Sequence, residues 1–169
     1  MSLFLTLFDS LVKPVLLYGA DVWGNFALNS SNNPLDKFVN KFYKTLLGVP
    51  KYTSTVGLHI ELGRFPMSIY IKNAMLKYWC RLATLPKTRL AAHCYWSLYN
   101  INNVNDKWLS SIKDIISSTS QEHVNFLWNS QESLRKVNPK TINKSLKQVS
   151  EILKKQLPFF CCGYNGRTK

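Results

Sequence analysis

Acidic residues are scarce in this chain. Of its 169 residues, 9 are Asp or Glu and 22 are Lys or Arg, so the formal net charge is +13. No two aspartates are adjacent, and metal-assisted chemistry on phosphate esters needs clustered carboxylates. We therefore expect no enzymatic activity. So large an excess of positive charge favours an anionic partner, with nucleic acid first and an anionic membrane second.

Metal-binding and nucleotide-binding motifs are also missing. The four cysteines, Cys80, Cys94, Cys161 and Cys162, form no C-x-x-C pair, and the three histidines stand far apart. No spacing typical of a zinc site is therefore present, nor a G-x-G-x-x-G loop or a Walker box. We expect no metal and no cofactor. Free thiols indicate a reducing, intracellular location, either nuclear or cytoplasmic.

Long hydrophobic runs are absent as well. A membrane-spanning helix needs about 20 uninterrupted apolar residues. The apolar N-terminus is interrupted by Asp9, Lys13 and Pro14, and it lacks the positively charged start of a secretory signal peptide. We therefore predict neither a signal peptide nor stable membrane insertion.

Helical periodicity is the main signal that is present. The clearest helix is predicted over residues 34–47, with Asn33 as its N-cap, Pro34 in its first turn and Gly48 at its C-terminal end. Its apolar side consists of Leu35, Phe38, Val39, Phe42, Tyr43 and Leu46. Its basic side consists of Lys37, Lys41 and Lys44. This division predicts an amphipathic helix with its lysines in solvent.

The rest of the pattern predicts an all-α fold, an irregular helical bundle. Further helices are predicted over residues 66–85, 89–99, 124–128 and 138–157, and a short one ends near residue 63. Another is marked by apolar residues between 108 and 116 and ends in residues 117–120. Pro14 is predicted to kink or break the first helix. Residues 24–34, rich in Asn and Ser, are predicted to be a loop. The pattern of residues 53–60 is compatible with either a helix or a strand. An Asn-rich break divides the chain into domains 1–100 and 101–169.

Basic residues supply the candidate binding site. The lysine stripe of residues 34–47 has the form of a surface that follows a phosphate backbone, although an ordinary solvated helix face has the same pattern. The predicted nucleic-acid-binding residues are Lys37, Lys41, Lys44, Lys51, Arg64, Lys72 and Lys77. Lys72 falls within an apolar arc, so it either reaches along the helix to solvent or meets an anion. The predicted helix over residues 138–157 has a lysine-rich face, and three roles stay open for it: core packing with the lysines in solvent, nucleic-acid binding, or binding to a membrane surface.

Four short blocks, in order, carry a resemblance to a known family. They are Leu-Leu-Tyr-Gly-Ala-Asp-Val-Trp-Gly at 16–24, Asp-Lys-Phe at 36–38, Leu-Leu-Gly-Val at 46–49 and Glu-Leu-Gly-Arg-Phe-Pro at 61–66. In this pattern the chain resembles the thumb and connector region of non-LTR (LINE-type) retrotransposon reverse transcriptases. In such enzymes this region follows the palm, so the catalytic part is expected upstream of Met1.

The resemblance implies a helical thumb over residues 1–100 and a connector-like segment over 101–169. It implies that residues 34–47 lie near a primer–template duplex and that residues 16–23 pack on a palm, here missing. The stretch around Asp21 superficially resembles the catalytic Tyr-x-Asp-Asp box but is not that box, because Gly19 adds a residue and Val22 stands in place of the second aspartate. Asp21 is expected to cap a helix or pair locally. The chain therefore looks like a fragment or a decayed copy without polymerase activity.

Two classes of function follow as hypotheses. The first is a non-catalytic module that binds the RNA or DNA backbone without sequence specificity, beside a reverse transcriptase palm. The second is a small helical protein-interaction or membrane-surface module without a role on nucleic acid. Four N-terminal apolar residues, Leu7, Phe8, Leu11 and Leu16, are expected to be left exposed without a palm and to promote self-association.

Overall fold

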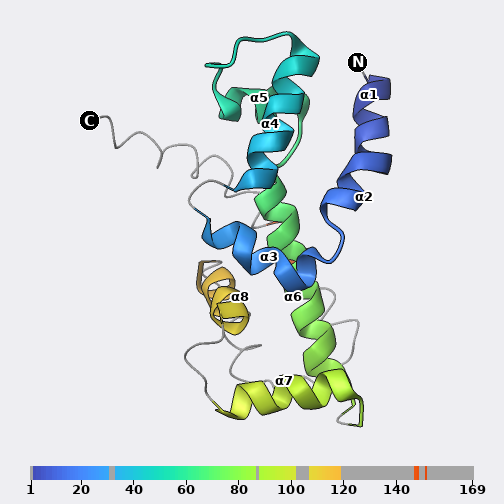
Figure 1. The fold of residues 1–169 in the computed structure, drawn as a ribbon, viewed down its shortest axis with the longest axis vertical. Coiled ribbons are helices and arrows are strands. Elements are labelled where there is room, and N and C mark those ends of the chain that lie inside the picture. The colour runs from blue at the N-terminus through green and yellow to red at the C-terminus, as the bar shows by residue number, and fades with distance from the viewer. Residues whose placement is uncertain are drawn as a thin grey trace, which may run out of the picture. The chain divides into compact units, whose positions relative to one another are not determined.

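Helices make up all the regular secondary structure that the computed structural model describes, which covers residues 2–30, 33–86, 88–101, 107–118, 147–148 and 151. In chain order they are α1 (Ser2–Leu7), the π-helical segment η1 (Phe8–Val12), α2 (Lys13–Leu16), α3 (Ala20–Asn29), α4 (Pro34–Leu47), α5 (Thr55–Leu62), α6 (Met67–Thr84), α7 (Leu90–Ile101) and α8 (Lys107–Ser118) (Figure 1). No strand occurs in these ranges, so the all-α prediction is confirmed. The helix predicted over 124–128 lies outside the described residues, as does most of that over 138–157.

Local sequence signals place the ends of α4 and α5. The Asn33 side chain accepts a hydrogen bond from the Leu35 N–H (3.0 Å), which caps the start of α4. Gly48 has a φ of 65° and Gly63 a φ of 60°, a left-handed conformation that ends each helix at little cost only for glycine. The stretch 53–60, open between helix and strand, mostly belongs to α5.

The loop predicted over residues 24–34 is wrong in its first half, because α3 continues through Gly24 to Asn29. Ala20, Gly24 and Ala27 follow one another at helical spacing, and all three are buried. Small side chains on this face let the helix pack closely against its surroundings. Tertiary packing therefore outweighs the low helix propensity of Gly and Asn.

The first helical segment does not end at Pro14. Proline has no N–H, and its ring collides with the carbonyl four residues earlier in a regular α-helix. The chain widens into the π-helical turn η1 just before it, where the Lys13 N–H donates to the Phe8 carbonyl oxygen five residues back. The helix then resumes as α2, which carries Pro14 in its first turn.

The described residues divide into two compact units, with the boundary inside α6 between Ile71 and Lys72. Unit 1 contains α1 to α5 and the start of α6. Unit 2 contains the remainder of α6 with α7 and α8. This division by packing differs from the Asn-rich break near residue 100, which stays a prediction of a domain boundary.

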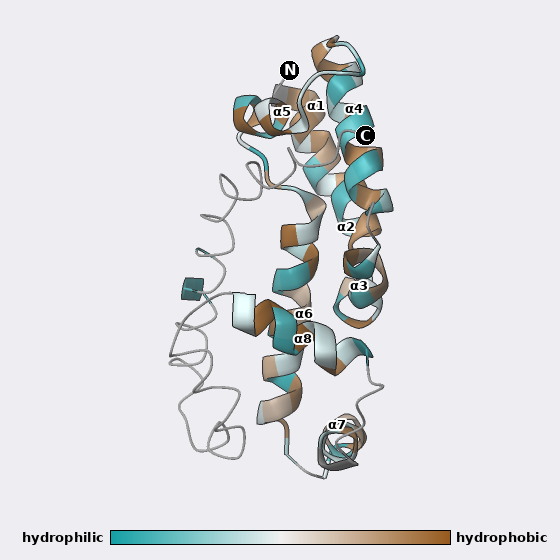
Figure 2. Ribbon diagram, turned by 90° about the vertical axis from the view of Figure 1, so that its left-hand side faces the viewer, coloured by the Kyte–Doolittle hydropathy of each residue, from teal (hydrophilic) through white to brown (hydrophobic). Residues whose placement is uncertain are grey.

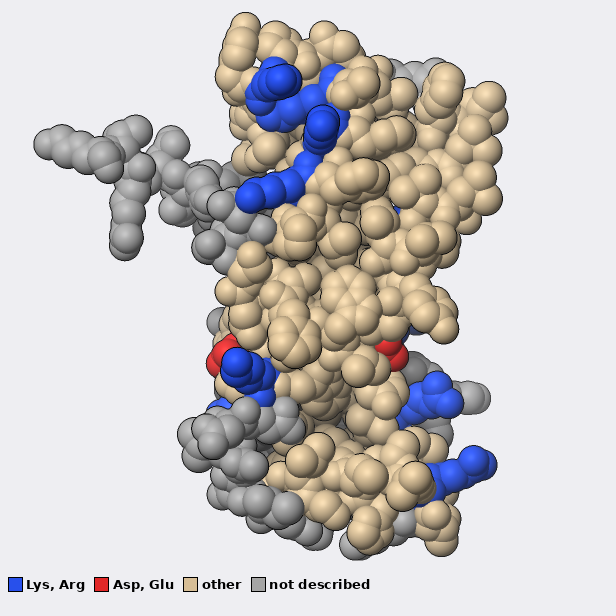
Figure 3. Space-filling view, viewed as in Figure 1, with Lys and Arg blue, Asp and Glu red and all other residues tan. Residues whose placement is uncertain are grey.

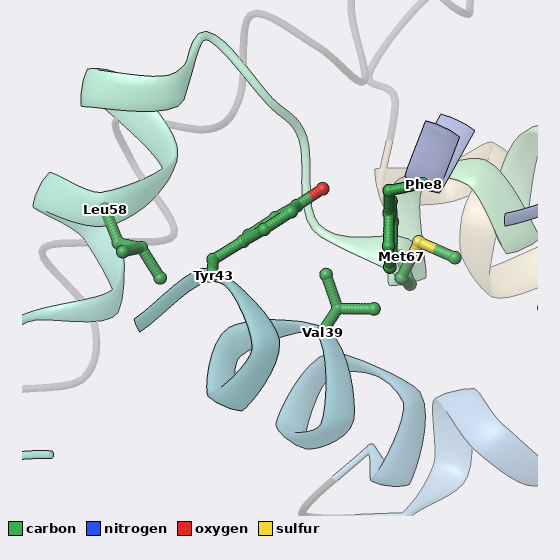
Figure 4. Close-up of a cluster of buried hydrophobic side chains, with 5 residues drawn as sticks. All are labelled: Phe8, Val39, Tyr43, Leu58 and Met67. Carbon is green, nitrogen blue, oxygen red and sulfur yellow. The ribbon is translucent and has the colours of Figure 1, made fainter. Parts of the chain in front are cut away.

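The core of unit 1 gathers around the buried face of α4. Its fully buried members are Phe8, Val39, Tyr43, Leu58 and Met67. Figure 4 shows Val39 and Tyr43 rising from α4, with Leu58 of α5 on one side and Phe8 and Met67 on the other. The Phe8 ring stacks on Phe42, with centroids 4.7 Å apart. The opposite face of α4 is thereby left for polar residues.

The core of unit 2 is aromatic and aliphatic. The Trp79 Nε1–H donates to the Tyr95 hydroxyl oxygen (3.0 Å), which joins α6 to α7. The Tyr78 and Trp108 rings meet edge to face at 6.0 Å, which joins α6 to α8. Trp79 and Trp96 are buried in this core, and Trp108 is half-buried.

Candidate nucleic-acid interface

The lysines of α4 lie on the side of the helix away from the unit 1 core. Lys37 and Lys41 are exposed and Lys44 is half-buried, whereas Val39 and Tyr43 are buried. The spacing of i, i+4 and i+7 aligns the three lysines along the helix. In Figure 2 the ribbon of α4 passes repeatedly from teal to brown, as an amphipathic helix must.

The Lys51 backbone lies beside the last turn of α4. The Lys44 Nζ donates a hydrogen bond to the Lys51 carbonyl oxygen (2.6 Å), so the loop after the helix is tied back to the last turn. A lysine ammonium has three N–H donors, so this bond leaves two of them for other partners. Lys51 is exposed, and the four residues Lys37, Lys41, Lys44 and Lys51 are called the basic row below.

The nearest acid in sequence does not neutralise the basic row, because its carboxylate serves another helix. Asp36 Oδ1 accepts hydrogen bonds from the Met67 N–H (2.6 Å) and the Ser68 N–H (3.4 Å) at the start of α6. Its Oδ2 accepts one from the Asn33 side-chain amide (3.1 Å). A carboxylate is stabilised there by the positive end of the helix dipole. Figure 3 shows Lys and Arg side chains over the α4 part of unit 1, with no acidic atom among them on that face.

Arg64 is engaged elsewhere in unit 1. Its guanidinium forms an ion pair with the Asp9 carboxylate of η1, which also lies 3.8 Å from the Lys13 ammonium. The Lys13 Nζ in turn sits 3.4 Å from the centre of the Tyr70 ring, a cation–π contact. The structure thus gives Arg64 a role in joining η1 to the segment before α6 and does not add it to the basic row.

Lys72 and Lys77 belong to unit 2. Lys77 is exposed. Lys72 is half-buried, and burial lowers the pKa of its ammonium group. Their role in binding nucleic acid beside α4 therefore stays a prediction. The basic row, in contrast, lies within unit 1.

Two aromatic side chains flank the basic row, and neither is among the residues predicted from the sequence to bind nucleic acid. Phe38, predicted on the apolar side of α4, is 52% exposed, and Tyr52, directly after Lys51, is 90% exposed. The signal that indicates Tyr52 is its place in a Pro-Lys-Tyr-Thr turn, where an aromatic has little to pack on. For Phe38, helical angle alone places it at the edge of the apolar face, so its exposure depends on what α4 contacts.

The described part of the chain shows no side-chain cluster suited to binding a metal ion. No group of three or more His, Cys, Asp or Glu side chains there has the arrangement to hold a metal ion. Burial raises the pKa of the Cys80 thiol to about 12, so this cysteine is protonated at neutral pH and is a poor nucleophile. Asp21 lies in the first turn of α3. Cys161 and Cys162 lie outside the described residues.

Comparisons of the chain with protein-family models, with curated proteins and with solved structures found no match in any of the three. Within the described ranges no helix taken alone has the length and apolarity to cross a membrane. The N-terminal segments 3–16 and 20–29 reach that threshold only as a pair, and they meet at an angle of 89°.

Proposed function

We propose that this chain is a non-catalytic module that binds the phosphate backbone of nucleic acid, in the role of the thumb and connector of a non-LTR retrotransposon reverse transcriptase. The observation that carries the proposal is the basic row: three lysines aligned on α4 opposite the unit 1 core, and Lys51 in the loop that the last of them holds. The resemblance of the sequence blocks to that family supports it. The chain's net charge of +13 does so as well.

The length of the basic row suits the spacing of phosphates along a nucleic-acid backbone. Lys37 and Lys44 are separated by about 10 Å along the axis of α4, given a rise of about 1.5 Å per residue. A duplex carries about one phosphate charge per 1.7 Å of its axis, so this length faces several phosphates. A lysine ammonium is a point charge that contacts any phosphate, so the row binds without regard to base sequence.

Salt dependence measures these contacts directly. Four phosphate contacts predict that log affinity falls with log salt with a slope of about −3.6, or about 10²-fold between about 50 and 200 mM salt. Fluorescence anisotropy with labelled DNA, RNA and hybrid duplexes of one sequence supplies both the affinity and the slope. Binding that is absent, or that does not respond to salt, contradicts the proposal.

A charge-matched pair of variants locates the interface. Lys37→Gln with Lys41→Gln removes two exposed charges from the basic row and is expected to reduce the slope by about 2 on a duplex. Lys107→Gln with Lys113→Gln removes two exposed charges from α8 and is the matched control. Equal losses in the two variants mean that net charge, and no particular surface, attracts the nucleic acid.

An apolar surface favours the second candidate function, a helical interaction module. Exposed apolar side chains recur at helical spacing along α1, η1 and α2: Leu3, Phe4, Leu7, Leu11 and Val15. Phe8 is an exception to the expectation from the sequence, because it is buried in the unit 1 core, and Leu16 is half-buried against that core. The exposed residues would suit a palm domain or a second copy of this chain.

Self-association tests this second candidate. Light scattering after size exclusion is expected to show a mass that rises with protein concentration. Leu7→Lys with Leu11→Lys, which places charge on the exposed face, is expected to restore the monomer. A wild-type monomer at all concentrations argues against self-association. Binding to neutral and anionic vesicles alike assigns the face to a membrane surface.

A further inference from the structure

Tyr52 is the most exposed of the large apolar and aromatic side chains in the described residues. Burying an aromatic ring is favourable, so a ring with 90% exposure gains nothing from its position in the fold itself. Single exposed apolar residues are common on proteins. Tyr52 differs from them in its immediate setting, because it directly follows Lys51 at the end of the basic row.

The loop that carries Tyr52 is held at three points. The Val49 N–H donates to the Lys44 carbonyl oxygen (3.1 Å), and the Val49 side chain packs on the unit 1 core. The Lys44 Nζ holds the Lys51 carbonyl oxygen (2.6 Å). The Thr53 N–H donates to the Pro50 carbonyl oxygen (3.1 Å), which closes a turn with Lys51 and Tyr52 at its tip. The turn therefore presents a charge and a ring together from a fixed base.

An exposed ring beside a row of charges distinguishes between forms of nucleic acid. Within a continuous duplex each base is already stacked on both faces, so a surface ring reaches only the backbone. An unpaired base offers a free face, and stacking on an aromatic side chain strengthens the binding of single strands whatever the base is. Combined aromatic and basic side chains are the usual means by which proteins hold single strands.

We propose that the basic row and Tyr52 form one site for single-stranded nucleic acid, including the single-stranded end of a duplex. Phosphates of the strand lie along Lys37, Lys41 and Lys51, and the Tyr52 ring stacks on an unpaired base at the α5 end of the row. Phe38, half-exposed at the edge of α4, offers a second apolar surface beside the same strand. The assignment rests on the proposed function and names the form of its ligand.

Equilibrium binding to three probes tests the assignment: a labelled 20-nucleotide single strand, the blunt duplex of that sequence, and the duplex with a single-stranded extension. The wild-type protein is expected to bind the single strand and the extended duplex about 10-fold more tightly than the blunt duplex, within the range that one stacked base supplies. Tyr52→Ala is expected to lose this preference while keeping its salt slope. Tyr52→Phe, which keeps the ring, is expected to behave as the wild type.

Tyr18→Ala is the matched control, since Tyr18 is a tyrosine with 85% exposure that precedes α3 and has no lysine next to it in sequence. Equal thermal midpoints for the Tyr52 and Tyr18 variants establish that both fold. A 2-aminopurine base in the single strand is expected to be quenched on binding by the wild type and by Tyr52→Phe, and not by Tyr52→Ala.

The outcomes separate this assignment from the function on which it rests. If Lys37→Gln with Lys41→Gln weakens binding while Tyr52→Ala binds all three probes as the wild type does, backbone binding stands and the stacking role of Tyr52 is refuted. If no probe binds, both are refuted. A Tyr52→Ala protein that differs only in binding to another protein assigns the ring to a protein partner and also overturns the stacking role.

Discussion

Replacing Phe8 with alanine is expected to lower the free energy of unfolding by about 3–5 kcal/mol. Phe8 is 2% exposed, and its ring centroid lies 4.7 Å from that of Phe42 and 5.5 Å from that of Tyr43. The substitution removes the transfer energy of the ring, leaves a cavity in the unit 1 core, and deletes two aromatic contacts worth about 0.5–1.5 kcal/mol each. Phe8→Leu keeps most of the apolar volume, so its loss should be smaller.

Phe4→Ala is the matched control for this prediction. Phe4 stands one helical turn before Phe8, but its ring is 59% exposed, so its truncation should change the free energy of unfolding by about 0.5 kcal/mol or less. Urea denaturation followed by far-UV circular dichroism and by tryptophan fluorescence measures both variants. Equal losses for the two variants, or a loss below about 1 kcal/mol for Phe8→Ala, would refute the packing of η1 on α4.

Two further predictions concern polar groups in unit 1. Asp36→Ala is expected to lower the free energy of unfolding by about 1–2 kcal/mol, because it removes the acceptor for the N–H groups that begin α6. Asp36→Asn keeps an acceptor oxygen and should lose less; equal losses in urea denaturation would count against this role. Burial lowers the pKa of His59 below its ordinary 6.5, and the nearby Asp36 charge opposes this shift. The stability that the neutral His59 side chain supports is therefore complete above about pH 6.5 and declines as the pH falls through the folded-state pKa. Denaturation midpoints should therefore drop between about pH 7.5 and 5 in the wild type and less in His59→Gln, and parallel slopes would contradict the assignment.

Helix ends followed from sequence signals wherever a single residue controls them. Asn33, Gly48 and Gly63 act through their own backbone conformation or a hydrogen bond two residues away, so a short window of sequence contains the whole cause. The amphipathic pattern of α4 likewise needs only the helical period, and it predicted outward lysines correctly. Phe38, at the edge of the apolar face, is 52% exposed, because the width of a buried face depends on what covers it.

The candidate site likewise contains features that depend on contacts between residues distant in the sequence. Lys37, Lys41 and Lys44 were placed together by their spacing on one helix, but Arg64 was grouped with them only because it is basic. Its actual partner, Asp9, is 55 positions away in the chain, and no local pattern connects the two. Tyr52 lies outside every helical period, so the one sequence signal for its exposure is the Pro-Lys-Tyr-Thr turn that contains it.

The amino-acid order alone was sufficient for the all-α class, both ends of α4, the C-terminal end of α5, and the cationic side of α4. These features arise from interactions between residues a few positions apart, whose strength hardly depends on the rest of the molecule. Tertiary packing decided that α3 is helical through Gly24, that Asp36 serves the start of α6, and that Arg64 pairs with Asp9. Each of these depends on which distant segments come into contact, and that choice follows from the burial of the whole core.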